Sequence, residues 1–171
     1  KIILNMPKEI SNEFKNSFAP ISNNETQILI LGSLPGEKSL QMAEYYAHPQ
    51  NRFWRVLAKL TNSPLPIDYG EKIDLLLKNN LGVWDVVKTA KRIGSLDTNI
   101  LDEVPNDLEG FIEDHPNLEV IVFNGSKSQK LFDKYFIREP NLKYLELPST
   151  SPANATYNFE RLCERWLQIV R

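Results

Sequence analysis

The sequence has little cysteine. Cys163 is the single cysteine among 171 residues, so no disulfide can form within the chain and no metal site can be built from several thiolates. We therefore expect a reducing compartment, the cytoplasm. Cys163 falls on the apolar face of the final helical pattern, and we interpret it as an unreactive core residue.

An excess of one charge and long apolar runs are also absent. Lysine and arginine total 20 and aspartate and glutamate 22, a formal net charge of −2, so any contact with nucleic acid has to be local. No apolar run approaches the roughly 20 residues that cross a bilayer. Residues 1–20 lack the basic-then-apolar layout of a signal peptide. We expect a soluble, cytoplasmic protein with no membrane partner.

Histidines are few, and motifs that hold metals or triphosphates are missing. His48 and His115 are the two histidines, and neither belongs to a recognisable Ser-His-Asp arrangement or metal-ligand spacing. The turn GSLPG at residues 32–36 is not a Walker loop, because no Gly-Lys-Ser/Thr follows it. We expect no metal and no cofactor, and chemistry that relies on positioning, base recognition and electrostatic stabilisation.

Short apolar runs, each followed by a helical pattern, predict an α/β fold. Such alternation is typical of βα units, and 171 residues suffice for three layers. We predict a single three-layer α/β/α domain over residues 1–171, with a short, mainly parallel four-stranded sheet and a peripheral lead-in at 1–26. The expected strands are 28–31, 81–87, 118–123 and 143–147, the expected helices are 53–60, 69–79, 106–115, 126–136 and 159–170, and residues 88–105 are expected to form a long loop.

The stretch over residues 28–54 organises the chain. Its apolar run ends in the turn at 32–36, where two glycines let the backbone approach a ligand. Residues 45–54 then crowd aromatic rings, His48 and the amide of Asn51 into one loop, which suits a flat, hydrogen-bonding ligand such as a nucleobase. The alternative is a core-packing loop in which Asn51 caps the following helix.

Loops that follow parallel strands meet at one edge of the sheet. Asp85 interrupts an apolar strand there, and it is either a buried carboxylate that needs a partner or a cap of the turn at the strand end. Asn124-Gly125-Ser126 forms either an anion site at a helix N-terminus or an ordinary N-cap by Ser126. The loops expected at this edge are residues 32–52, 85–99, 124–126 and 148–155.

Several motifs resemble those of the uracil-DNA glycosylase superfamily. GSLPG at 32–36 is similar to its first motif, and HPQNRFW at 48–54 to the stretch that follows in the mismatch-specific uracil/thymine-DNA glycosylases. DVVK at 85–88 resembles their Asn-Ile-Val-Lys segment, and LPSTSPANA at 147–155 the second motif, which enters the DNA minor groove. Together with FNGS, these motifs look most like the hypoxanthine-DNA glycosylase (DNA-deoxyinosine glycosylase) branch. The resemblance covers most of the chain.

Two departures from the family motifs argue against an efficient uracil enzyme. Leu34 stands where uracil-removing relatives place the Asp or Asn that orients the attacking water. Leu147 replaces the usual histidine of the second motif. In the hypoxanthine branch, the resemblance moves the catalytic amide to Asn51.

The resemblance implies a role for each site residue. Asn51 would hold a water near the anomeric carbon, and Phe53 would stack on the flipped base, with Tyr46 closing its other side. An ionised Asp85 would accept from N1–H of hypoxanthine, whereas a protonated one would donate to the departing purine. The remaining base contacts are Ser33 and Leu34. DNA contact is assigned to Ser149, Thr150 and Ser151, to Pro152, Ala153 and Asn154 as the wedge or gap-filler, and to Lys88, Asn124 and Ser126. Lys88, Lys91 and Arg92 supply local charge or form a solvated surface, and His48 either binds a phosphate or orients the loop, or is purely structural.

The leading prediction is a monofunctional DNA glycosylase of base excision repair. It would flip out a deaminated base, chiefly hypoxanthine, and hydrolyse its N-glycosidic bond to leave an abasic site, because no lysine nucleophile is evident. The alternatives are a uracil or G:U/G:T mismatch glycosylase and a non-catalytic binder of damaged DNA. The expected partner is double-stranded or single-stranded DNA, and we expect a monomer.

Overall fold

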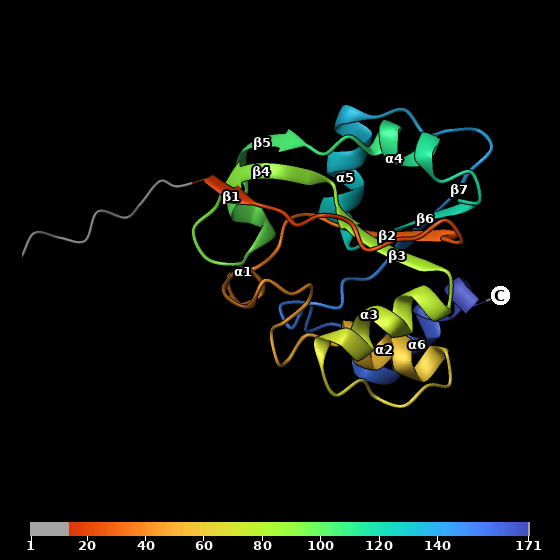
Figure 1. Ribbon diagram of the computed structural model, residues 1–171. Helices are drawn as coiled ribbons and strands as arrows, with labels where there is room; N and C mark the ends of the chain where they lie inside the picture. The colour runs from red at the N-terminus through yellow and green to blue at the C-terminus, as the bar shows by residue number, and fades with distance from the viewer. Residues whose placement is uncertain (1–13, 171) are drawn as a thin grey trace, which may run out of the picture.

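A four-stranded parallel sheet lies at the centre of the structure (Figure 1), a computed structural model that describes residues 14–170. The neighbouring strands all run parallel, as the alternation of apolar runs and helices predicts. This confirms the α/β class. The strand order is β3 (Leu81–Asp85), β2 (Ile28–Gly32), β6 (Val120–Asn124) and β7 (Lys143–Leu147).

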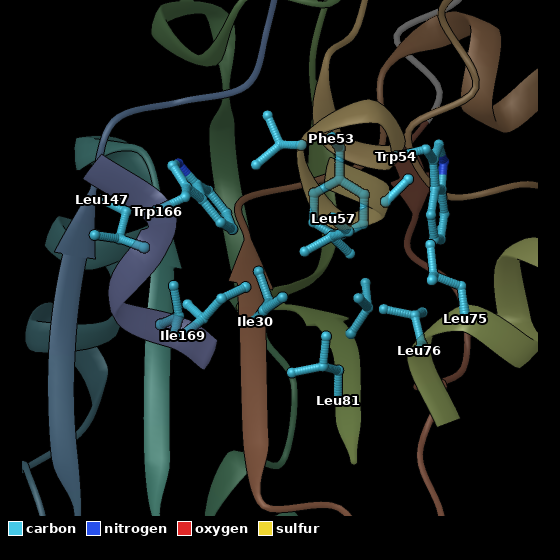
Figure 2. Close-up of a cluster of buried hydrophobic side chains, with 14 of the residues drawn as sticks. Ile30, Phe53, Trp54, Leu57, Leu75, Leu76, Leu81, Leu147, Trp166 and Ile169 are labelled. Atoms are coloured by element: carbon cyan, nitrogen blue, oxygen red, sulfur yellow. The ribbon is translucent and has the colours of Figure 1, made fainter. Parts of the chain in front are cut away.

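Both faces of this sheet are covered by helices, because its strands are apolar on both sides. Successive residues of β2 alternate between two core clusters: Ile30 belongs to one, and Leu29 and Leu31 to the other. Figure 2 shows the first cluster. It contains residues of α2 (Phe53–Leu60), α3 (Tyr69–Lys78) and α6 (Phe159–Trp166), whereas the second contains residues of α4 (Leu108–Asp114) and α5 (Ser126–Tyr135). The predicted three-layer α/β/α arrangement is confirmed.

Residues 88–105 do not form the long loop predicted from the sequence. β4 (Val87–Lys91) and β5 (Leu101–Pro105) pair antiparallel, with a short 3₁₀ turn at Asp97–Asn99 between them. β1 (Phe14–Asn16) pairs with the other edge of β4 to complete a second, three-stranded sheet. β1 belongs to the expected lead-in, whose residues 1–13 lie outside the described part of the chain.

The strand predicted over residues 81–87 is wrong in its extent, since it is divided between the two sheets. β3 ends at Asp85 and β4 begins at Val87. The buried side chain of Asn106, predicted to start a helix, donates to the backbone carbonyls of both residues, at 2.8 and 3.2 Å. β4 carries two lysines among five residues, so it lacks the apolar run that would predict a strand.

Other boundaries agree closely with expectation. α2 and β7 begin and end where predicted, whereas the final helix continues beyond α6 as a 3₁₀ turn (Leu167–Val170). The short helix α1 (Glu37–Met42) lies in the loop after β2 and was not predicted. Within residues 14–170, no helix combines the length and apolar character needed to cross a bilayer.

Candidate active site

Loops at the carboxyl edge of the parallel sheet line a cavity of about 660 Å³. This size is within the range of small-molecule sites and admits a nucleobase. All four of the predicted loops contribute; the loop predicted over 85–99 does so through Asp85 and through residues 95–98, which lie in the connection between β4 and β5. Of the predicted site residues, Asn51, Ser33, Leu34, Tyr46, Asp85, His48, Asn124, Ser126, Ser149, Thr150, Ser151, Pro152 and Asn154 line this cavity; Phe53 and Lys88 do not.

The side chains of Asp85 and Tyr46 both lie against the backbone of Gly32 at the end of β2. A Cβ atom on Gly32 would lie 2.6 Å from Asp85 Oδ1 and 3.0 Å from Tyr46 Oη. Asp85 is only 4% exposed. It is the last residue of β3 and pairs with Gly32 in the register of the two strands. The glycine of the first motif is therefore needed for both polar groups to lie this close to the end of β2.

The Asp85 carboxyl and the Tyr46 hydroxyl have unused hydrogen-bonding capacity. Asp85 Oδ2 and Tyr46 Oη are buried and have no hydrogen-bond partner among the described residues. Burial raises the pKa of Asp85 to about 7, although the Arg92 guanidinium opposes this shift. Burial also raises the pKa of Tyr46, so its phenol stays protonated. Near neutral pH the cavity thus offers a phenolic donor beside a carboxyl group that is divided between acid and carboxylate. Such unmet polar groups in a cavity favour a polar ligand.

Asn51 lies at the wall of the same cavity and also supports the start of α2. Its Oδ1 accepts a hydrogen bond from the N–H of Phe53, at 3.0 Å. Arg52, and not Asn51, is the N-cap of α2, so the capping alternative is wrong as stated, although the Asn51 amide does bond the first N–H of the helix and lies in the cavity lining. Because a carbonyl oxygen accepts two hydrogen bonds, the same Oδ1 can also hold a water.

Phe53 is not placed to stack on a base, contrary to our prediction. Its side chain is fully buried in the core, where Figure 2 shows it among Trp54, Leu57 and Trp166. The ring of Tyr46 stacks on Phe53, with the centroids 4.0 Å apart and the planes at 24°. Tyr46 lines the cavity, and Phe53 supports it from behind.

The hydroxyl groups in the loop that follows β7 have two kinds of role: one is buried and holds the loop in place, and others lie in the cavity lining. Thr150 is fully buried and pairs with Asn124: its N–H donates to Asn124 Oδ1 and its Oγ1 accepts from Asn124 Nδ2, both at 3.0 Å. The prediction that Thr150 binds DNA is therefore wrong for its hydroxyl. Ser149 Oγ accepts from the N–H of Ser151, at 3.1 Å, so its own hydrogen remains free to donate to a phosphate. Pro152 is exposed at the tip.

Arg52 ties this loop to the HPQNRFW segment. Its guanidinium donates to the carbonyl oxygens of Ser151 and Asn154, at 3.1 and 3.0 Å, and to that of Tyr157. The Arg52 N–H in turn donates to the carbonyl of Thr150, at 3.1 Å. These bonds fix the distance between the Asn51 amide and the loop expected to contact DNA. Sequence reasoning did not assign a role to Arg52.

The Asn124-Gly125-Ser126 turn brings the N-terminus of α5 to the cavity. Gly125 caps the helix with φ of 96° and no side-chain bond, so the alternative in which Ser126 is the N-cap is wrong. A Cβ on Gly125 would be 3.1 Å from that of Ser149. The glycine lets the turn pack against the loop after β7, and the helix N-terminus favours negative charge at this wall.

Arg92 lies beneath the GSLPG turn and not on a solvated surface. Its side chain is 1% exposed, and its guanidinium donates to the carbonyl oxygens of Leu34 and Pro35. Asp97 Oδ1 lies 3.8 Å from Arg92 Nη1 and accepts a 2.5 Å hydrogen bond from Ser33 Oγ. Leu34 packs its side chain into the second core cluster. Arg92 and Asp97 therefore hold the first motif in place.

The remaining predicted residues lie at the margin. His48 is exposed at the cavity rim, and its Nδ1 accepts from the N–H of Gln50, at 3.1 Å. Lys88 is exposed on β4 and lies outside the cavity lining. This agrees with the alternative in which Lys88 belongs to a solvated surface. Lys91 lies 3.7 Å from the Asp102 carboxylate. Nowhere in the described residues do three or more His, Cys, Asp or Glu side chains gather as a metal site.

Comparison with known protein families identifies the family to which the chain belongs. The sequence model of the family described as Uracil DNA glycosylase superfamily matches residues 19–170. The chain belongs to this superfamily. The match includes every loop that lines the cavity, so Asn51, Asp85 and the loop after β7 lie within the family's domain.

Individual relatives agree with this membership. Hypoxanthine DNA glycosylase from Methanosarcina barkeri is 44% identical over 115 residues, 67% of this chain and 73% of that protein. Hypoxanthine DNA glycosylase from Methanosarcina acetivorans is 37% identical over 158 residues, 92% and 98% of the two chains. A solution NMR structure from M. acetivorans, provisionally described as a uracil DNA glycosylase, superposes with a TM-score of 0.78 at 35% identity and covers 93% of this chain and 98% of its own.

Within the superfamily fold, this site can bind a flat polar ligand and donate to it, but it presents few charges to it. The cavity, which is large enough to admit a nucleobase, contains one buried carboxyl group, a buried phenolic oxygen and a wall amide. Sequence reasoning missed the roles of Arg52, Asp97 and Asn106, and it interpreted Arg92 as a source of local charge or a solvated residue. They position the site through bonds to backbone carbonyls or across long sequence separations, which leave no local pattern in the sequence.

Proposed function

We propose that the chain is a monofunctional DNA glycosylase that excises hypoxanthine from DNA and leaves an abasic site. The observation that carries the proposal is that the buried oxygens Asp85 Oδ2 and Tyr46 Oη have unmet hydrogen-bonding capacity in a cavity that admits a nucleobase and whose wall holds the Asn51 amide. Two relatives that bear the name hypoxanthine DNA glycosylase support the choice of base.

The reaction would break the N-glycosidic bond and join a water oxygen to C1′ of the deoxyribose. The electron pair of the broken bond leaves with the purine, and positive charge develops on the sugar. Asn51 Oδ1 would accept a hydrogen bond from the attacking water through the lone pair that the Phe53 N–H does not use. The proton that the water loses passes to the departing base or to solvent.

Asp85 would act on the leaving group. In its protonated form it donates a hydrogen bond to the purine, on which negative charge develops, and the Tyr46 hydroxyl supplies a second donor. In its ionised form it only accepts, and it repels that charge. The protonated form is therefore the productive one for bond cleavage, and the pKa of about 7 keeps it populated at neutral pH.

DNA would be held at the rim of the cavity. We assign phosphate contacts to Ser149 and Ser151, with the exposed Pro152 and the partly buried Asn154 beside the space that the extruded nucleotide leaves. Arg52 keeps this loop at a fixed distance from Asn51. Backbone contacts of this kind give affinity without reading sequence.

Hydrolysis is proposed in preference to lysine chemistry. Lys38 is the lysine in the cavity lining, and it is exposed on α1 and not buried in the way that activates an amine. Borohydride added during turnover should trap no covalent protein–DNA adduct. A trapped adduct that disappears in Lys38→Ala would instead show a bifunctional lyase.

The substrate is tested with end-labelled duplexes that each carry one hypoxanthine, uracil, mismatched thymine or xanthine, followed by alkali to cut abasic sites. We expect cleavage of the hypoxanthine duplex above all others. Cleavage mainly at uracil or thymine would favour a uracil or mismatch glycosylase. No cleavage of any duplex that the protein binds would show a non-catalytic binder.

A further inference from the structure

Two large apolar side chains are exposed in the bend between β4 and β5. Ile93 is 68% exposed and Leu96 54% exposed, and Leu96 lies in the lining of the cavity. Building on the proposed function, we propose that Leu96 is a wedge: it enters the base stack of duplex DNA and fills the space left by the extruded nucleotide. Ile93 would flank it on the same bend.

A wedge has to be held rigidly, and the bend is anchored on the first motif. At its start, Arg92 donates to the carbonyl oxygens of Leu34 and Pro35. Directly after Leu96, Asp97 accepts from Ser33 Oγ at 2.5 Å. Leu96 is thus carried between two anchors that both bind the turn at the bottom of the base site.

Further bonds close the bend itself. Ser95 Oγ accepts from the N–H of Glu37 at the start of α1, at 2.8 Å, and Asn99 Nδ2 donates to the carbonyl of Ile93, at 3.0 Å. In Figure 1 this green segment lies directly beside α1. Gly94 has φ of 75°, which allows the tight reversal between Ile93 and Ser95.

Leu96 and the loop after β7 reach the cavity beside different strands of the parallel sheet. The anchors of Leu96 belong to the end of β2, whereas Pro152 and Ala153 follow β7, and β6 separates these two strands. The cavity rim therefore carries exposed side chains of low polarity from two separate segments. Apolar side chains inserted between base steps unstack and kink duplex DNA, so such a rim suits an enzyme that extrudes a nucleotide.

The wedge predicts a difference between duplex and single-stranded substrates. Leu96→Ala should lower the single-turnover rate of hypoxanthine release from a duplex about tenfold, because stacking then opposes extrusion. The same variant should release hypoxanthine from a single strand within about twofold of the unsubstituted protein, since no partner strand or intact stack has to be displaced. Leu96→Met should retain duplex activity, because it keeps a large apolar side chain. Ile137→Ala, at a residue that is 91% exposed and outside the cavity lining, is the matched control.

Equal losses on both substrates would show that Leu96 only shapes the pocket, and no loss on either would show that it has no role; both results overturn the proposal. A binding measurement separates this proposal from the choice of base. In a duplex with 2-aminopurine beside a tetrahydrofuran abasic analogue, the protein should raise the 2-aminopurine fluorescence, and Leu96→Ala should bind without that rise. An unchanged rise in Leu96→Ala would refute the wedge, whichever base the enzyme excises.

Discussion

Replacing Asp85 by asparagine should make the protein more stable at alkaline pH and remove the pH dependence of catalysis. The pKa of Asp85 rises from 3.8 to about 7 on folding, chiefly through burial. At about 1.4 kcal/mol per pKa unit, the ionised carboxylate costs the folded state up to about 4 kcal/mol. This cost is absent below the unfolded pKa, grows as the pH rises toward about 7, and stays constant above it.

Urea unfolding measures the stability part of this prediction. The free energy of unfolding of Asp85→Asn should exceed that of the unsubstituted protein at pH 8, by at most about 4 kcal/mol, and the difference should fall below about 1 kcal/mol near pH 4. The asparagine amide fills nearly the same volume and carries no charge, so the comparison isolates ionisation.

Single-turnover release of hypoxanthine measures the catalytic part. The rate of the unsubstituted protein should be level below pH 7 and fall about tenfold per pH unit above it, as the productive acid is lost. Asp85→Asn keeps an N–H donor at all pH values, so its profile should be flat and its rate at pH 9 should exceed that of the unsubstituted protein. Glu146→Gln, which removes an exposed carboxylate from the cavity lining, should keep the unsubstituted profile. The reasoning is refuted if the unsubstituted profile is flat between pH 5 and 9, or if Asp85→Asn keeps the inflection.

Four further substitutions test other parts of the site. Asn51→Ala should slow hypoxanthine release about 10²- to 10³-fold while anisotropy shows unchanged binding to an inosine duplex; equal losses in both would mean that Asn51 only binds DNA. Phe53→Ala should lower the free energy of unfolding by about 3–5 kcal/mol in urea, because it empties a fully buried site, and unchanged stability would contradict its core position. Arg92→Gln should move the inflection of the pH–rate profile above pH 7, because the Arg92 charge lowers the pKa of Asp85, whereas Arg92→Lys should leave it in place; identical profiles would exclude that electrostatic link. Gly32→Ala should abolish base release, because its Cβ would lie 2.6 Å from Asp85 Oδ1, and an active variant would show that Asp85 and Tyr46 need not both lie this close to Gly32.

The sequence predicted the layers of the fold because these depend on patterns within short segments. Strand β2 is apolar at every position before its glycine, which is typical of a strand buried on both faces. Strand β4 lies in the three-stranded sheet, and two of its five residues are lysines, so it has no continuous apolar run. Its pairing with β1 is a contact across more than 70 residues of chain, which no local property of either segment encodes.

The sequence predicted the composition of the site better than the orientation of its side chains. Tyr46 and Phe53 are equivalent as aromatic residues of one loop, but the structure turns one ring to the cavity and buries the other beneath it. Arg92 was interpreted as surface charge because its partners, the carbonyls of Leu34 and Pro35, lie nearly 60 residues earlier in the chain. Thr150 is buried by its bonds to Asn124, again a contact between distant segments.

The central claim is that the protein releases intact hypoxanthine by hydrolysis of the glycosidic bond. Quantifying free base by mass spectrometry and alkali-labile sites by gel, in the same reaction with an inosine duplex, tests it most directly. We predict one free hypoxanthine for each abasic site, and formation of both products about 10²- to 10³-fold more slowly with Asn51→Ala. Strand breaks without free hypoxanthine, or binding of the duplex with no free base at any pH, would contradict the account.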